Sequence, residues 1–462
     1  MADGNATAPS PADGLSTEQR RWAKLAIFTA LSMASLDTAI ANIALPAIAA
    51  DLKATPADVI WVVNVYQIAM VATLLPLGAL GEIVGHQRIY LGGLILFTLA
   101  SVACAMAWSL DTLLIARVLQ GLGGAGVMSV NTALVRFVYP PNQLGRGFGH
   151  NALVVATSFT LGPTIASGIL SVGSWPWLFA INLPFGALAI LIGMKTLPKT
   201  SRATHPFDFL GALLSSICLG LLILGIDSAA HHTAAPVVVG ELVAGALVGW
   251  LVIRRQADHP APMLPIDLFR RPVFALSAAT AICSFSVQGL AFVSLPFYFE
   301  DILHRSQVET GFFLTPWPLV VAIMAPIAGG LSDRYPAGIL GGIGLTMLGV
   351  GMALLAMLPV EPSIPDIVWR MVVCGAGFGF FQAPNMKALM SSAPAGRSGS
   401  ASGIVATARL TGQSTGAALA AFCFGLVGHE GATLALALGA GFAAVGCAMS
   451  FLRLIVQPSP NM

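Results

Sequence analysis

Asp37 is the residue whose position suggests chemistry most directly. It stands inside Trp22–Pro46, an apolar segment long enough to span a lipid bilayer. An ionised carboxylate near the bilayer centre costs at least about 3 kcal/mol, so such a residue faces a wet or protein-lined interior. There it can take up and release a proton, which is the chemistry of coupled transport. A purely structural ion pair is the alternative role.

Arg117 and Gln120 supply a second polar group inside an apolar stretch. They are three residues apart and therefore share a helix face. Counted along its helix, Asp37 lies about 14 Å from the outer membrane surface and Arg117 about 9 Å. Because an arginine side chain can bridge that difference, we expect Arg117 to reach Asp37. The pair could serve proton coupling or be structural only.

The composition places these residues in a membrane protein. The chain of 462 residues is 56% hydrophobic and only 9% charged, whereas soluble domains carry roughly 25% charged residues. We count fourteen apolar stretches of about 20 residues between positions 23 and 453. The six cysteines form no CxxC pair, so neither a metal site nor a disulfide framework is expected. The fold class is an all-α membrane protein.

The positions of the basic residues and an internal sequence repeat indicate how these stretches are arranged. If the N-terminus is cytoplasmic, nearly all Lys and Arg residues of the connecting segments fall inside, and only Lys53 and Arg305 fall outside. Gly78–Glu82 and Gly329–Arg334 are similar in sequence and in place, which indicates two parallel six-helix halves. The expected domains are a disordered cytoplasmic tail (1–21), the N-terminal half (22–200), two inserted helices (201–258), the C-terminal half (259–455) and a cytoplasmic tail (456–462).

Several motifs follow one another in a recognisable order. They are Leu36–Thr38 with Asn42–Pro46, Gly78–Arg88, Arg117–Ala125, Leu161–Gly168, Trp175–Pro184 and Ala408–Gln413. Together they resemble the major facilitator superfamily, and within it the fourteen-span drug:proton antiporters. The resemblance runs from about Ala23 to Arg453 and implies two pseudo-symmetric six-helix halves with two extra central helices.

The resemblance also implies roles for two of these motifs. A cytoplasmic gate would use Gly78, Glu82, Gly85 and Arg88, and in the second copy Asp333 and Arg334. The first copy departs from the family pattern, since Glu82 replaces an aspartate and His86 and Gln87 replace basic residues. The antiporter motif would use Gly162, Pro163 and Gly168 to let helices pack closely.

A substrate cavity is expected near the membrane midplane, between the two halves. Polar and aromatic side chains within the apolar stretches are its candidate lining, although each could instead bond two helices together. They are Asn42, Asn64, Gln67, Gln120, Asn131, Gln288, Trp317, Gln382, Arg409 and Gln413.

These features predict a proton-coupled secondary active exporter, an antiporter of hydrophobic or amphipathic small molecules as in multidrug efflux. Asp37 and Arg117 are its proton-coupling pair. No nucleotide-binding or HExxH motif is present, and we expect no enzyme activity and no cofactor besides the proton gradient. The expected partners are a small-molecule substrate, protons and the lipid bilayer, without nucleic acid or nucleotide.

Two other functions remain open at this point. The chain could export an anionic metabolite with an intramembrane arginine, namely Arg117, Arg370 or Arg409. It could also be a non-transporting membrane sensor or scaffold, although a scaffold has no need of Asp37. We expect a monomer in the cytoplasmic (inner) membrane of a bacterium, with both termini cytoplasmic.

Overall fold

The computed structural model describes almost the whole chain as helix. The described residues are 15–54, 56–200, 202–203, 207–230, 235–256, 266–305, 307–359, 361–394, 397–427 and 430–456, and they contain no strand. The outermost parts of both expected tails, 1–14 and 457–462, lie outside these ranges.

The helices fall into two bundles joined by a linking region. The first bundle comprises α1 (Thr17–Leu52), α2 (Pro56–Val84), α3 (His86–Ala105), α4 (Leu110–Val138), η1 (Pro141–Gln143), α5 (Leu144–Val172), α6 (Pro176–Ala180) and α7 (Asn182–Thr196). The linking region carries α8 (Phe209–Ala230), α9 (Ala235–Gln256) and α10 (Ile266–Phe269). The second bundle comprises α11 (Pro272–Phe297), η2 (Tyr298–Ile302), α12 (Gln307–Leu314), α13 (Pro316–Leu331), α14 (Ala337–Ala356), α15 (Ile364–Ser392), α16 (Ser398–Val427) and α17 (Gly431–Ile455).

Ten helical stretches in the described chain are long and apolar enough to cross a membrane. They are Trp61–Val84, His86–Ala105, Leu110–Val138, Pro176–Thr196, Pro236–Gln256, Pro272–Phe297, Glu309–Leu331, Ala337–Ala356, Ile364–Ser392 and Gly431–Ile455. Two of these stretches contain a local break, between α6 and α7 and between α12 and α13. The second break falls at Pro316, which has no N–H to continue the helical hydrogen bonds.

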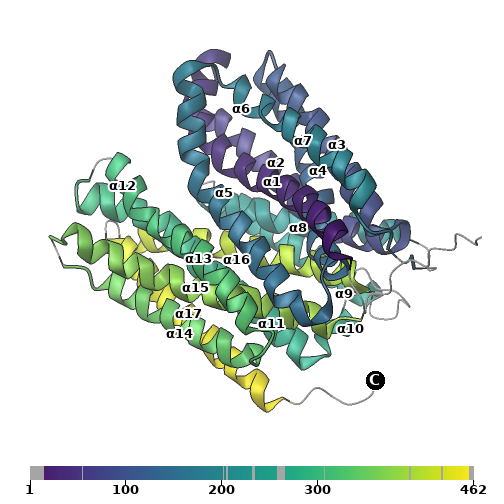
Figure 1. The fold of residues 1–462 in the computed structure, drawn as a ribbon. Helices are drawn as coiled ribbons and strands as arrows, with labels where there is room; N and C mark the ends of the chain where they lie inside the picture. The colour runs from purple at the N-terminus through teal and green to yellow at the C-terminus, as the bar shows by residue number, and fades with distance from the viewer. Residues whose placement is uncertain are drawn as a thin grey trace, which may run out of the picture.

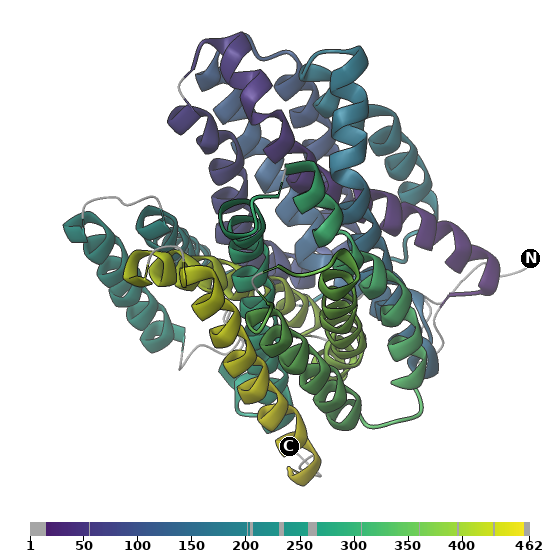
Figure 2. The same ribbon diagram turned by 90° about the vertical axis from the view of Figure 1, so that its left-hand side faces the viewer.

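The two bundles meet along two seams (Figure 1). At one seam α5 of the first bundle packs on α13 of the second, and at the other α2 packs on α16. Helices α8 and α9 pack on each other, and α8 also contacts α2 and α16. A view turned by 90° again separates the first bundle from the second, with α9 and α8 to one side (Figure 2). A site between the bundles is therefore built mainly from α1, α2, α4 and α5 on one side and α11, α15 and α16 on the other.

Helix α1 begins earlier than the sequence suggested. Residues up to 21 were expected to be disordered, but the helix starts at Thr17. The Ser16 side chain caps it by accepting a hydrogen bond of 3.4 Å from the Gln19 N–H, and Glu18 lies in the first turn. Just before the helix, the Leu15 N–H donates to the Val138 carbonyl, which ties this end to α4.

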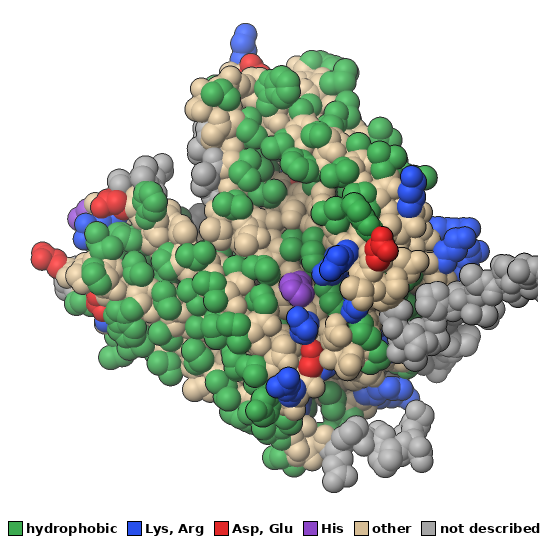
Figure 3. Space-filling model, viewed as in Figure 1, with side chains coloured by type: hydrophobic (Ala, Val, Ile, Leu, Met, Phe, Trp, Pro, Cys, Tyr) green, Lys and Arg blue, Asp and Glu red, His purple; other side chains and the backbone are tan. Residues whose placement is uncertain are grey.

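Apolar side chains cover most of the surface in the space-filling view (Figure 3). This is the surface expected of a protein surrounded by lipid, because hydrocarbon cannot solvate charges. Lys and Arg side chains gather towards one end of the molecule, near the start of α1, while the opposite end is hollowed between α12 and α5. The two ends of the molecule therefore differ in both charge and shape.

Candidate functional site

Asp37 on α1 and Arg117 on α4 form a buried ion pair. The Arg117 Nη1 donates to Asp37 Oδ2 over 2.6 Å, and the Asp37 side chain is 2% exposed and that of Arg117 0%. Gln120, one turn further along α4, donates from Nε2 to the other carboxylate oxygen over 2.8 Å. Both oxygens of Asp37 are thus held by α4, so a change in its charge acts directly on the contact between α1 and α4.

Arg117 contacts four further residues. Its Nε donates to the Val62 carbonyl of α2 over 2.8 Å, and its Nη1 also donates to Gln120 Oε1 over 2.6 Å. The guanidinium carbon lies 4.3 Å from the ring centre of Tyr66 and 5.5 Å from that of Phe179. Cation–π contacts of this kind stabilise a desolvated cation by about 2 kcal/mol. The guanidinium is therefore also held by contacts that do not involve Asp37.

The network continues through Gln120 to α3 and α7. Gln120 Nε2 donates to Ser101 Oγ over 3.0 Å, and Asn182 Nδ2 donates to the same oxygen over 3.3 Å. Ser101, Asn182 and Gln120 are all buried. Five helices of the first bundle thus share one polar cluster, which we call the carboxylate cluster: Asp37, Tyr66, Ser101, Arg117, Gln120 and Asn182.

The sequence predicted part of this cluster. The expected contact between Asp37 and Arg117 is present. Gln120 had been grouped with the cavity residues, but its amide is engaged by Asp37 and Arg117 instead. Ser101 and Asn182 were missed, because nothing in the sequence indicates which face α3 and α7 turn towards α4.

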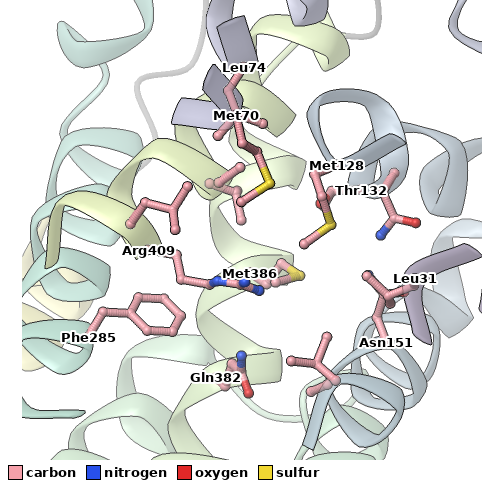
Figure 4. A pocket seen from close by; sticks show the side chains of 16 residues that line it. Leu31, Met70, Leu74, Met128, Thr132, Asn151, Phe285, Gln382, Met386 and Arg409 are labelled. Carbon is pink, nitrogen blue, oxygen red and sulfur yellow. The ribbon is translucent and has the colours of Figure 1, made fainter. Parts of the chain in front are cut away.

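A cavity lies between the two bundles, and the space inside it, open solvent included, is about 620 Å³. Of the predicted lining residues, Asn131, Gln382 and Arg409 do line this cavity. Figure 4 shows Asn151 and Thr132 on the side of the first bundle, and Gln382 and Arg409 on the side of the second.

Six other predicted lining residues are described and do not border this cavity: Asn64, Gln67, Gln120, Gln288, Trp317 and Gln413. Gln413 of α16 donates to Gln288 of α11 over 2.8 Å, so this pair joins two helices of the second bundle. Trp317 is fully buried within the same bundle, against Phe292 and Phe378. Asn64 and Gln67 are half-buried on α2. The side chain of Asn42 lies outside the described part.

Two acidic residues join the bundles at the end where the basic side chains gather, which we call the closed end. Glu82, at the end of α2, accepts a hydrogen bond of 2.7 Å from the Ser400 N–H in the first turn of α16. Asp333, after α13, accepts one of 3.0 Å from the Gly145 N–H in the first turn of α5. Each carboxylate therefore meets the positive end of a helix dipole in the opposite bundle.

The basic partners of these acids differ from those expected. Arg88 and Arg334 are exposed. Instead, Asp333 pairs with Lys387 of α15 over 2.7 Å, and Arg397 lies 3.9 Å from Glu82. Arg88 belongs to the first turn of α3, and Arg334 lies beyond the end of α13.

Two further residues cross the closed end and were not predicted. Arg136 of α4 donates to the carbonyls of Met390 and Ala393 at the C-terminal end of α15, over 3.1 and 3.0 Å. The ring of His86 lies 3.3 Å from Ser398 Oγ at the start of α16. In the sequence each is only a polar residue at a helix end, and that position does not identify the residue it contacts.

The glycines of the two motifs behave differently. Gly85 has φ of +107° between α2 and α3, a conformation that side chains disfavour, and Gly78 is buried. Gly162 is also buried, whereas Gly168 faces open space and a Cβ there would meet nothing within 4 Å. The side chain of Pro163 lies outside the described part. Close packing at Gly168 is therefore not seen in this conformation.

No metal site is evident in the described chain, where no three His, Cys, Asp or Glu side chains come together. The arrangement instead combines a titratable carboxyl group, a cavity shared by two bundles and a bonded closed end. This combination can bind a small molecule between the two bundles.

The comparison with family models decides the assignment. The model of the Major Facilitator Superfamily matches residues 27–417. This chain belongs to the Major Facilitator Superfamily. Members of the family are transporters, not enzymes.

Relatives in sequence and in structure agree with that assignment. An uncharacterised transporter of Escherichia coli K12, YebQ, is 51% identical over 97% of this chain and 98% of its own length. The tetracenomycin C resistance and export protein of Streptomyces glaucescens is 30% identical over 89% of this chain and 77% of its own. Among solved structures, the human organic anion transporter MFSD10 has the same fold, with a TM-score of 0.68 and 16% identity over 93% of this chain and 99% of its own.

Proposed function

We propose that this transporter is a proton-coupled antiporter that exports hydrophobic or amphipathic small molecules by alternating access. The observation that carries the proposal is the carboxylate cluster, which holds a titratable group buried in the first bundle beside a cavity shared by both. Asp37 is suited to this role because loss of its charge would weaken both of its hydrogen bonds to α4.

The proposed topology has fourteen spans. The ten candidate spans are joined by α1, α5, α8 and α16, whose lengths also suffice. Three of these four helices carry polar residues that face the protein interior: Asp37 on α1, Asn151 on α5 and Arg409 on α16. Helices α8 and α9 are then the inserted pair between an N-terminal half (22–200) and a C-terminal half (259–455).

We propose that the closed end faces the cytoplasm of a bacterial cell, with both termini on that side. Basic side chains concentrate there, as the positive-inside rule requires. The hydrogen bonds between bundles given above all lie at this end, which corresponds to an outward-facing state. The proposed transporter works as a monomer, without a cofactor, in the cytoplasmic membrane.

In this mechanism Asp37 is the proton-carrying residue and Arg117 its partner. A proton from the outside neutralises Asp37 and weakens its hold on α4, while Arg117 remains held by Val62 and Tyr66. The helices of the first bundle can then shift, and the bonds at the closed end break as the cavity opens inwards. Substrate binding there favours release of the proton, and the bundles return.

The test uses everted membrane vesicles from cells that produce the protein. Ethidium, riboflavin and fluorescein serve as cationic, neutral and anionic probes. We expect accumulation of at least one probe that a protonophore abolishes, together with probe-induced decay of an imposed pH gradient. Accumulation that persists with the protonophore present, or that leaves the pH gradient untouched, would refute proton coupling.

A further inference from the structure

Arg409 is the one charged side chain among the described residues that border the cavity between the bundles. It lies within α16, away from the aqueous ends of that helix. Figure 4 shows its guanidinium extending from α16 into the middle of the cavity, towards Met386 of α15. The cation therefore occupies the space that a bound molecule would enter.

This cation has no partner within the described chain. Three other arginines in the helices have partners. Arg117 pairs with Asp37 and Arg370 pairs with Asp366. Arg453 donates hydrogen bonds to Asn385 and Ser277. Arg409 takes part in neither a hydrogen bond nor an ion pair with any described residue. A charge at membrane depth is costly unless something compensates it, and a partner of opposite charge is the strongest compensation.

The rest of the cavity wall narrows the class of that partner. Leu31, Met70, Met128, Phe285 and Met386 supply apolar surface, and methionine side chains adapt to ligands of differing shape. Asn131, Asn151 and Gln382 are neutral and can donate or accept hydrogen bonds. The wall suits a ligand with a mainly apolar body.

The described lining of the cavity offers no acidic group to a cationic ligand. No Asp or Glu is among the described residues that line the cavity. Asp37 does not line it, and both of its carboxylate oxygens are occupied by Arg117 and Gln120. An organic cation would meet the unpaired charge of Arg409 without a carboxylate to offset the repulsion.

We propose that the cavity binds amphipathic organic anions, with Arg409 holding the carboxylate, sulfonate or phenolate group. A guanidinium can bind such a group through two parallel hydrogen bonds, which adds direction as well as strength. The apolar body of the anion lies against the methionine and phenylalanine side chains. This inference rests on the proposed export function and specifies the substrate class of its cavity.

The charge of the substrate has a consequence for energetics. If one proton enters as one monovalent anion leaves, two positive charges move inwards in each cycle. A membrane potential that is negative inside then drives export strongly, in addition to the pH gradient. For a monovalent cation the same exchange would move no net charge.

The test measures equilibrium binding to the purified full-length protein in lipid nanodiscs, with no gradient. The probes share one aromatic body: 2-naphthoate as the anion, 2-naphthamide as the neutral form and 2-naphthylmethylammonium as the cation. Arg409→Gln removes the charge, and Arg409→Lys keeps it without the planar fork. Arg254→Gln is the matched control, since Arg254 lies on exposed α9 and stacks on Trp250.

We expect wild type to prefer naphthoate to both other probes. Arg409→Gln should weaken naphthoate binding by about 10- to 100-fold and naphthamide binding by less than about threefold. Arg409→Lys should lie between wild type and Arg409→Gln, and Arg254→Gln should match wild type.

Three results would overturn the inference. They are an absence of naphthoate binding to wild type, equal or tighter binding of the cation, and an equal loss of naphthoate and naphthamide in Arg409→Gln. The last would indicate collapse of the cavity rather than loss of a charge. Because binding is measured without a gradient, its outcome does not depend on whether the vesicle experiment finds proton coupling.

Discussion

Glu82 accepts a hydrogen bond of 2.7 Å from the backbone N–H of Ser400, so an acid of the first bundle caps a helix of the second. The relationship is reciprocal, since Asp333 of the second bundle caps α5 of the first through Gly145. Repetition within the sequence has thus produced two equivalent bonds that cross the molecule in opposite directions. Together they hold one end closed.

Glu82→Gln and Asp333→Asn should each favour opening of that end. A carboxylate at a helix N-terminus contributes about 1 to 2 kcal/mol in a partly buried site, so each change should shift the equilibrium by roughly 5- to 30-fold. The double variant should shift it more. A cysteine introduced at Val405, which borders the cavity, reports opening when a membrane-impermeant maleimide is added from the closed end.

The matching control is the same set of variants without the Val405→Cys change, because the six native cysteines could also react. Labelling in the double variant that stays at the wild-type level would show that neither acid holds the end closed.

Gly329→Ala should open the same end by a steric route. A Cβ at Gly329 would collide with the carbonyl oxygen of Gly145 on α5, whereas a Cβ at neighbouring Gly330 would meet nothing within 4 Å. Overpacking of this kind costs typically about 1 to 3 kcal/mol. We expect increased labelling of Val405→Cys in Gly329→Ala and wild-type labelling in Gly330→Ala. Equal labelling in both variants would mean that the α5–α13 seam does not control access.

The sequence was sufficient to find Asp37 and Arg117 because each is a charge at an estimable depth in an apolar helix. Because the rise per residue of a helix is constant, the depth of each residue could be estimated, and the two depths were enough to predict the contact. It could not supply rotation about the helix axis, and for that reason Gln120 was assigned to the cavity and Ser101 was missed. The length of a helix follows from its residues, but the direction of a side chain depends on its neighbours.

The partners of the two acids at the closed end could not be predicted from the sequence. Glu82 and Asp333 were recognised from local motifs, and local bases were expected to pair with them. Two of their partners, Ser400 and Gly145, lie on helices of the other bundle and contribute backbone N–H groups, which every residue except proline has. Such contacts leave no residue-type signal. The methionines that line the cavity could not be predicted either. In the sequence they resemble ordinary packing residues, and only the folded structure shows that they lie between the two bundles.

Asp37→Asn should abolish proton-driven export while leaving the protein in the membrane. Asparagine keeps the shape of the side chain but does not titrate. It also leaves Arg117 without its counter-charge, so we expect a stability loss of about 3 to 5 kcal/mol relative to wild type. Uphill transport into proteoliposomes under an imposed pH gradient is the measurement.

Asp37→Glu is the companion variant, since it retains a titratable group and should keep part of the coupling. Gradient-free exchange of labelled for unlabelled probe tests whether Asp37→Asn still cycles. Uphill transport by Asp37→Asn at the wild-type rate would place the coupling residue elsewhere.

Arg117→Ala should damage transport far more than Arg370→Ala, by about tenfold or more in rate. Arg117 is fully buried and holds Asp37, Gln120 and the Val62 carbonyl, whereas Arg370 pairs with Asp366 at 3.1 Å near the start of α15, where both side chains are partly exposed. Loss of Arg117 leaves Asp37 without its cation, and Asp37 escapes that penalty by holding its proton. Probe-induced proton release should therefore require higher pH in Arg117→Ala, while Arg370→Ala should follow the wild-type profile, because water and salt replace a partly exposed charge.

Proton release from purified protein, followed across pH with fluorescein as probe, separates the two. A wild-type profile in Arg117→Ala, or a larger displacement in Arg370→Ala, would exclude the Asp37–Arg117 pair from the coupling mechanism.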